Sequence, residues 1–249
     1  MIYGAILAGG TGSRMKLSKM PKQFIEIRDI PIIILTIKRM LEVEPFDCLY
    51  IAIHPEWEGY LKDVLYSYNV NTDKIKIVHG AKDRIGSIEN VINDIFESSQ
   101  VGDNDIIIIH DAVRPFASEE LFLRCIEASK KHDAVVATVP AIDTMVFAKD
   151  NEVTSIPDRS EIFNGQAPEG FKLRLFRDTL ESLNDVERSI ITGTVQICYA
   201  KGIKVNTVEG DYQNIKITTN EDLMLADLLV EKVYKVESMC IGSRWEACL

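Results

Sequence analysis

The segment DIIIIHD at residues 105–111 is apolar along both faces that an extended chain would present. This pattern is typical of a strand in the middle of a parallel sheet, where helices cover both faces. Other apolar segments of strand length alternate along the chain with longer segments of helical period. The alternation predicts an α/β protein with a Rossmann-like, three-layer architecture and a mostly parallel, twisted sheet. The predicted strands are 2–8, 48–54, 74–79, 105–111, 134–140, 144–149 and 204–210, and the predicted helices are 31–44, 55–69, 84–98, 118–131, 172–184 and 220–236.

One stretch of the chain interrupts this alternation. Residues 141–170 combine short β-like pieces with a turn-rich loop. Irregular segments of this length inside compact domains are usually functional, so we predict a protruding β arm that pairs with another subunit or closes over a site. The 249 residues are enough for one large core. We therefore predict a single domain over residues 1–236 and a C-terminal tail over 237–249, where the periodicity is lost.

Composition and charge narrow the class of partner. The net charge is −10, which argues against nucleic acid, because phosphate backbones are bound by clustered Lys and Arg. No apolar stretch approaches the ~20 residues that span a bilayer, and no signal peptide is recognisable. The five cysteines are scattered without metal-ligand spacing, which predicts reduced thiols and a cytoplasmic protein without membrane contact.

A glycine-rich loop follows the first predicted strand in the segment LAGGTGSRM. Gly9, Gly10 and Gly12 can adopt positive φ and turn backbone N–H groups toward an anion. In open α/β sheets the ligand site lies beyond the carboxyl ends of the strands, where this loop is placed. With Arg14 and Lys22 close in sequence, the loop predicts a triphosphate site.

Two well-known phosphate loops do not match this segment. A Walker A loop requires Lys-Ser or Lys-Thr after its last glycine, and neither is present. The dinucleotide fingerprint fails at its third glycine, where Met15 stands, and the next predicted strand ends in His54 instead of an acidic residue. An NAD-dependent reductase is therefore disfavoured.

The glycine loop and five further segments resemble a known family in the same order along the chain. The family is that of the cytidylyltransferases that activate sugar-alcohol phosphates, shared by the ribitol-5-phosphate and 2-C-methyl-D-erythritol 4-phosphate enzymes. The resemblance implies an α/β nucleotidyltransferase fold and transfer of the cytidylyl group of CTP to a polyol phosphate. The segments that carry it are GGTGSRM with MPKQF, GAKDRIGSI, HDAVRPF, VPAIDTMV, IPDRSEIFNGQAPEGF and GDYQNIKITTNEDLMLA.

By this resemblance the reaction depends on three cations and one carboxylate. Arg14 matches the cation that holds the triphosphate, Lys22 the cation that stabilises the α-phosphate, and Lys216 a cation on its opposite side. Asp111, at the end of the buried apolar segment, matches the ligand of Mg²⁺. We interpret the neighbouring His110 as a structural histidine.

The resemblance also implies the binding residues for both substrates. The cytosine would lie against the loop at Gly80, with Ser87 on its other edge. The implied CTP-binding residues are Leu7, Ala8, Gly9, Gly10, Gly12, Gly80, Ala81, Arg84, Ser87 and Asp111. The implied polyol-phosphate residues are Arg114, Asp143, Thr144 and Arg159. The last three lie in the arm and would act in the neighbouring subunit's site, which implies a homodimer with arm exchange.

Departures from the family pattern bear on the acceptor and on local rigidity. Relatives commonly read QTPQ where this chain has Ala167 and Glu169, and carry a Thr-Asp pair where it has Thr192 and Gly193. The opening LAGG motif and the IPDRSEIFNGQ segment look more like the ribitol-phosphate enzymes. We therefore expect D-ribitol 5-phosphate as acceptor, for teichoic acid or capsule synthesis. The alternatives are the methylerythritol phosphate enzyme of isoprenoid synthesis and a non-catalytic nucleotide-binding subunit.

Overall fold

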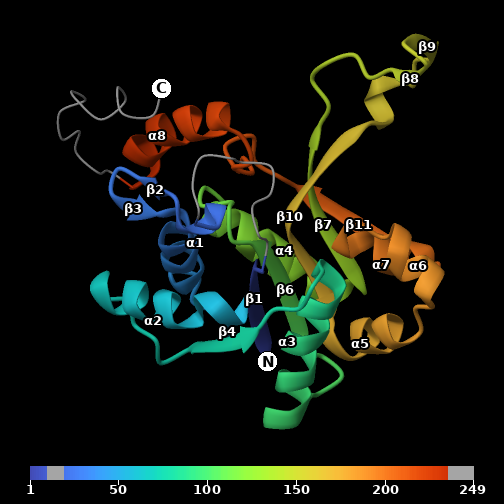
Figure 1. Ribbon diagram of the computed structural model, residues 1–249. Coiled ribbons are helices and arrows are strands. Elements are labelled where there is room, and N and C mark those ends of the chain that lie inside the picture. Colours follow the sequence, from blue (N-terminus) through green and yellow to red (C-terminus); the bar gives the residue numbers. More distant parts are fainter. Residues whose placement is uncertain (10–19, 235–249) are drawn as a thin grey trace.

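The computed structural model describes residues 1–9 and 20–234 (Figure 1). Gly10, Gly12, Arg14 and the tail predicted at 237–249 lie outside these residues. The central sheet has seven strands in the order β11-β7-β10-β6-β1-β4-β5. All neighbouring strands are parallel except β10, which runs antiparallel to β6 and β7. The strands are β1 Ile2–Ala8, β4 Cys48–Ile53, β5 Ile75–His79, β6 Ile106–Asp111, β7 Ala134–Pro140, β10 Phe163–Lys172 and β11 Val205–Glu209.

The prediction of an α/β fold with a mostly parallel sheet is confirmed. Most predicted helices begin and end within three residues of the observed ones, but α6 and α7 were not predicted. No described helix combines the length and the apolar content needed to cross a membrane. The helices are α1 Ile32–Leu41, α2 Glu58–Ser67, α3 Arg84–Ser98, α4 Glu119–Lys131, α5 Leu173–Glu181, α6 Asp185–Ile190, α7 Thr194–Ala200 and α8 Asn220–Tyr234.

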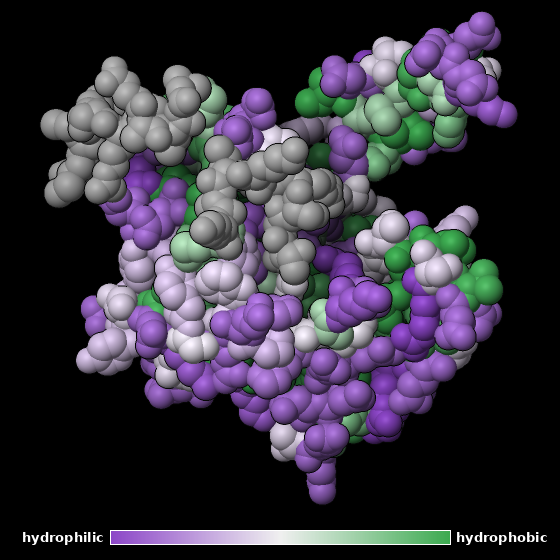
Figure 2. Space-filling model, viewed as in Figure 1, coloured by the Kyte–Doolittle hydropathy of each residue, from purple (hydrophilic) through white to green (hydrophobic). Residues whose placement is uncertain are grey.

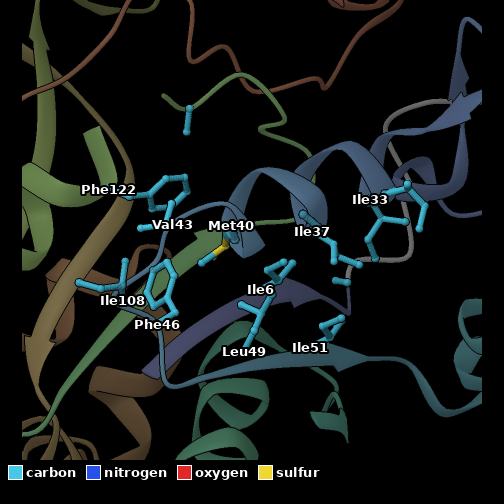
Figure 3. Close-up of a cluster of buried hydrophobic side chains, with 14 of the residues drawn as sticks. Ile6, Ile33, Ile37, Met40, Val43, Phe46, Leu49, Ile51, Ile108 and Phe122 are labelled. Atoms are coloured by element: carbon cyan, nitrogen blue, oxygen red, sulfur yellow. The ribbon is translucent and has the colours of Figure 1, made fainter. Parts of the chain in front are cut away.

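Strand β6 explains why its sequence is apolar throughout. Ile106 and Ile108 pack into the core under α1, α2 and α4, whereas Ile107 and Ile109 pack on the opposite face under α3, α5 and α7. Successive side chains of a strand point to opposite faces, so a strand covered on both sides needs an unbroken apolar run. Figure 3 shows the first of these cores, where Ile108 lies near Phe46 of the loop before β4.

The arm leaves the sheet after β7 and returns as β10. Its tip is a hairpin of β8, Phe147–Lys149, and β9, Glu152–Ser155, which stands away from the sheet and its helices (Figure 1). The projecting part spans residues 141–162. The second half of the predicted segment 141–170 belongs largely to the sheet, because β10 pairs with β7 from Phe163 onward and with β6 from Glu169 onward.

Five short elements complete the described fold, and the last of them lies in the arm. They are η1 Lys22–Phe24, β2 Glu26–Ile27, β3 Ile30–Pro31, η2 Pro55–Trp57 and η3 Arg159–Glu161. Helix α8 packs against β2, and its Ala226 and Val230 share a third apolar core with Ile27 and Ile217. The three described cysteines are free thiols, and burial raises the pKa of both Cys125 and Cys198 to about 12, as expected of small core residues.

Candidate active site

The candidate site lies at the carboxyl ends of the parallel strands. Leu7 of β1 pairs with Asp111 of β6, and the next amide, Ala112 N–H, donates to the Leu7 carbonyl at 3.2 Å. Ala8, which closes β1, accepts a hydrogen bond of 2.6 Å from the buried Gln23 side chain. Gln23 belongs to η1 and follows Lys22 directly. The fold thereby brings the backbone of Lys22 to the end of β1.

Two glycines face each other across this edge of the sheet. A Cβ placed on Gly80, just after β5, would lie 3.5 Å from the Cα of Gly9 and 3.4 Å from Ser87 Oγ. Among the described glycines positive φ occurs at Gly202 alone, so the prediction that Gly9 adopts positive φ is wrong. Two backbone segments without side chains therefore lie close together at this edge, and a Cβ on either glycine would meet only ordinary van der Waals contacts.

Ser87 holds the loop that follows Gly80. Its hydroxyl accepts from Ala81 N–H at 2.9 Å and donates to the Asp83 carbonyl at 2.8 Å. Asp83 caps α3 by accepting from Gly86 N–H at 2.8 Å. The Ser87 side chain thus holds Ala81, which the resemblance assigns to the CTP site, at the start of α3.

The carboxylate of Asp111 is the electrostatic centre of the site. Arg84 Nη1 lies 2.8 Å from Oδ1, while Arg114 Nε and Lys216 Nζ lie 3.1 and 3.0 Å from Oδ2. Burial acts to raise the pKa of Asp111, but the cations Arg84, Lys216 and Arg114 outweigh it and hold the pKa well below its usual range. Asp111 is therefore a permanently charged group at neutral pH.

A second buried carboxylate, Glu169, lies behind this centre. Arg84 Nη2 is 3.2 Å from Glu169 Oε2, and Arg84 Nε donates to Thr194 Oγ1 at 2.9 Å. Burial raises the pKa of Glu169, and the charge of Arg84 opposes that rise. Arg84 therefore joins α3 to β6, β10 and α7, with its donors directed at protein acceptors.

His110 is structural, consistent with the sequence interpretation. Its ring is fully buried against Phe122, and Nε2–H donates to the Arg114 carbonyl at 2.9 Å. Within residues 1–9 and 20–234 no group lies within hydrogen-bond distance of Nδ1. Burial lowers the pKa of His110 to about 4, so the ring is neutral at pH 7.

The predicted arm residues are not brought to this centre within one chain. Asp143, Thr144 and Arg159 are exposed, and the Arg159 guanidinium donates to the Ile142 carbonyl at 3.0 Å inside the arm. The arm stands away from the strand ends that carry Asp111 (Figure 1). Their predicted role in a neighbouring subunit's site stays a prediction.

Sequence reasoning missed four residues that support the site. The Asn214 side chain donates from Nδ2 to the Ala167 carbonyl at 2.6 Å, and the backbone carbonyl of Asn214 accepts from Arg114 Nη1 at 2.7 Å. The Gln166 side chain donates to the Asp211 carbonyl at 2.9 Å and accepts from Asp211 N–H at 3.2 Å. Together with Glu169 and Thr194 they lie on segments remote from the site in sequence. The one available signal was the added charge at position 169.

The donor set suits Mg²⁺ held largely by phosphates. Across the described part of the chain, no group of three or more His, Cys, Asp and Glu side chains is arranged to hold a metal ion. Mg²⁺ in nucleotide sites is commonly held by one or two carboxylates plus substrate phosphates and water. Asp111 is an ionised carboxylate that could take this part, but both of its oxygens are paired with cations, so Mg²⁺ would have to replace at least one of them.

Comparison with known proteins matches this geometry to one family. The family model described as IspD, 2-C-methyl-D-erythritol 4-phosphate cytidylyltransferase, matches residues 2–232. The match therefore covers almost all of the described chain, including the arm and α8.

Solved structures with similar folds carry related names. One is 4-diphosphocytidyl-2C-methyl-D-erythritol synthase from Anaerococcus prevotii, with 28% identity, a TM-score of 0.76 and coverage of 93% of this chain and 96% of that chain. Another is 2-C-methyl-D-erythritol 4-phosphate cytidylyltransferase from Francisella tularensis, with 26% identity, a TM-score of 0.76 and coverage of 91% and 98%. The Thermus thermophilus enzyme of that name, at 21% identity and a TM-score of 0.70, supports the fold alone.

Proposed function

Because the chain belongs to the 2-C-methyl-D-erythritol 4-phosphate cytidylyltransferase (IspD) family, we propose that it transfers the cytidylyl group of CTP to a polyol phosphate and releases pyrophosphate. One observation carries the proposal. A permanently ionised carboxylate, Asp111, lies at the carboxyl edge of the sheet with Lys216 and Arg114 around it, and the side-chain-free backbone of Gly9 and Gly80 lies at the same edge.

The proposed reaction needs no strong general base. The acceptor phosphate is mostly a dianion at pH 7, since its second pKa is ~6. One of its oxygens attacks the α-phosphorus of CTP, the bond to the β-phosphate breaks, and pyrophosphate leaves with the electron pair. The protein contributes orientation and charge stabilisation. The absence of a nucleophilic triad in the sequence is in keeping with this chemistry.

Each cation has a separate part in this proposal. Lys22, next to the end of β1, stabilises the α-phosphate, and Lys216 does so from the other side. Arg14 holds the triphosphate by resemblance alone, and Arg114 binds the acceptor phosphate. When bound, Mg²⁺ neutralises phosphate charge beside Asp111.

The acceptor we favour is D-ribitol 5-phosphate. The support is the opening motif LAGGTGSRM with MPKQF and the segment IPDRSEIFNGQ, which look more like the ribitol-phosphate enzymes. The product would then be CDP-ribitol, a precursor for teichoic acid or capsule polymers. The second candidate acceptor is 2-C-methyl-D-erythritol 4-phosphate, which the family and its solved relatives are named for.

We also propose that the protein is a homodimer with exchanged arms. The arm carries exposed apolar side chains that one chain leaves uncovered, as Figure 2 shows at the upper right. They are Ile142, Met145, Val146, Phe147, Val153, Ile156 and Phe163. Covering such a patch with a second copy is favourable, and it would deliver Thr144 and Arg159 to the other subunit's acceptor site.

The test is pyrophosphate release with CTP and Mg²⁺, offering ribitol 5-phosphate and methylerythritol 4-phosphate in parallel. A higher kcat/KM for ribitol phosphate is expected. Preference for methylerythritol phosphate would replace the acceptor and leave the cytidylyl transfer intact. If neither acceptor leads to pyrophosphate release in a protein that still binds CTP, the proposed reaction with these acceptors is overturned.

A Lys22→Ala variant serves as the control for this assay. Loss of one charge that stabilises a transition state typically costs ~10²-fold or more in rate, so turnover should nearly vanish. The fold should be retained, because the buried contact of η1 with β1 is made by Gln23. Turnover close to that of the wild type would remove Lys22 from its proposed role.

A further inference from the structure

Arg84 lies at the junction of three elements that meet behind Asp111. It is the first residue of α3, and its Nε, Nη1 and Nη2 point at Thr194, Asp111 and Glu169, respectively, at 2.9, 2.8 and 3.2 Å. The acceptors belong to α7, β6 and β10. A planar guanidinium that meets three acceptors in its own plane has little freedom to rotate.

The sheet register explains how Glu169 reaches Arg84. Glu169 pairs with Ile109, which lies two residues before Asp111 on β6. Side chains two residues apart on a strand share a face, and directly paired residues point to the same side. Glu169 and Asp111 therefore both point to the face that α3 covers, where Ile109 packs. Arg84 at the start of α3 is placed to bridge the two.

Glu169 is itself held from a second side. Glu169 is 7% exposed. The carboxylate oxygen that does not face Arg84, Oε1, accepts from Val195 N–H in the first turn of α7 at 3.4 Å. Gly193, which precedes that helix, has no side chain to offer as a cap. Glu169 thus fixes α7, and with it Thr194, against the same guanidinium.

We infer that Glu169 and Thr194 are positioning residues for Arg84, and that Arg84 in turn holds the carboxylate of Asp111 in its working orientation. The inference rests on the proposed function for its kinetic consequence. Lys216 and Arg114 are proposed to contact phosphates, so their bonds to Asp111 compete with substrate. Arg84 is also bonded to Glu169 and Thr194, so it keeps its bond to Asp111 Oδ1 when Lys216 and Arg114 contact phosphate instead.

The first measurement follows Arg84 itself by NMR of the protein labelled with ¹⁵N-arginine, with its Nε–H signal assigned by its loss in Arg84→Lys. In the wild type this signal should have the relaxation of a rigid group. Glu169→Ala and the isosteric Thr194→Val should each make it mobile. A signal that stays rigid in both variants would overturn the inference.

Asp105→Asn is the matched control. Asp105 is also a buried carboxylate, but it precedes β6 at the end of the strand remote from Asp111 and accepts from Gly102 N–H at 3.0 Å. Its loss should lower stability and leave the Arg84 signal unchanged. Mobility of Arg84 in this variant would mean that general loosening, and not Glu169, controls the guanidinium.

The second measurement is steady-state cytidylyl transfer with the same variants. Glu169→Ala should lower kcat about tenfold, a modest loss for a group that acts through another, with the KM for the acceptor changed less than about twofold. Glu169→Gln should recover part of the loss, because its amide oxygen still accepts one hydrogen bond. Wild-type kcat in Glu169→Ala, or an equal loss in Asp105→Asn, would overturn the kinetic part.

The two measurements separate the two hypotheses. If the wild type transfers no cytidylyl group, the proposed function fails, while the NMR signal still decides whether Glu169 and Thr194 position Arg84. If the wild type is active and the signal stays rigid in both Glu169→Ala and Thr194→Val, the inference fails and the proposed function stands.

Discussion

Gly80 leaves the backbone without a side chain at the edge of the sheet where the resemblance places the cytosine. A Cβ on Gly80 would lie 3.5 Å from Gly9 Cα and 3.4 Å from Ser87 Oγ. Neither glycine has a positive φ, and these distances are ordinary contacts, so neither backbone strain nor space within the fold requires glycine here. We therefore relate Gly80 to the proposed cytosine, which would lie against this backbone.

Gly80→Ala should separate binding from folding. The added methyl would meet its neighbours at 3.4 to 3.5 Å, which is ordinary contact, so we expect the free energy of unfolding to change by less than about 1 kcal/mol. The methyl would occupy space beside the backbone against which the cytosine is proposed to lie, so the KM for CTP should rise at least about tenfold. Denaturant unfolding and initial rates measure both quantities, and an unchanged KM would contradict the placement of cytosine here.

His110 predicts a pH dependence of stability. Burial lowers its pKa to about 4 in the folded protein, while an unfolded histidine titrates near 6.5. Between these values the unfolded chain binds a proton that the folded chain does not. The free energy of unfolding should therefore fall as the pH drops from 6.5 to 4, by up to about 3 kcal/mol from this group.

The matched variant for this measurement is His110→Gln, whose amide can still donate to the Arg114 carbonyl. Its stability at pH 7 should be lower than that of the wild type, and its slope between pH 4 and 6.5 should be flatter. Urea unfolding of the metal-free protein at several pH values gives both curves. Parallel curves would show that His110 does not titrate on unfolding.

At the scale of elements, the arm is a part of the described chain whose apolar side chains a single copy leaves exposed. Phe147 and Val153 are 61% and 59% exposed on a two-stranded hairpin. An isolated hairpin is marginally stable in water, so a partner surface would both cover these side chains and hold the arm. This is the physical basis of the proposed dimer.

Phe147→Asp with Val153→Asp should dissociate the dimer without unfolding the core, since both side chains lie outside it. Tyr66→Asp is the control, because Tyr66 is 87% exposed on α2, away from the arm. Light scattering after size-exclusion chromatography measures the mass. A wild-type monomer, or a dimer that survives the double substitution, would contradict arm exchange.

At the scale of the whole molecule, the site is assembled from distant segments. Gly9, Gly80 and Lys216 come after β1, β5 and β11, and Asp111 ends β6; the carboxyl ends of these parallel strands lie along one edge of the sheet. The proposed acceptor residues Thr144 and Arg159 would complete it from a second chain. If two chains share each site in this way, a dimer of two different inactive variants should be active.

Mixing inactive Lys22→Ala and Arg159→Ala proteins should restore activity. In a mixed dimer one site would combine an intact Lys22 from one subunit with an intact Arg159 from the other. After subunit exchange roughly a quarter of the wild-type rate is expected for a two-fold symmetric dimer. No recovery, in mixtures shown by mass spectrometry to contain mixed dimers, would place Arg159 outside the partner's site.

The patterns of single segments determined much of this protein from sequence alone. The strands at 2–8 and 134–140 and the helix at 84–98 were predicted with their observed bounds, because hydrophobic period and capping are local properties. The position of Asp111 at a strand's carboxyl end followed in the same way. The identities of the motifs then led to the family that the comparisons show.

The tertiary structure decided what depends on neighbours that are distant in sequence. The sequence predicts residues 163–170 as part of the arm, but residues 163–172 form β10, the antiparallel strand between β6 and β7. Gly165, Pro168 and Gly170 make the local pattern of this strand weak. That placement carries Glu169 to Arg84 and leaves Asp111 among three cations. Strand pairing and charge pairing are long-range contacts, and no local period encodes which partners they join.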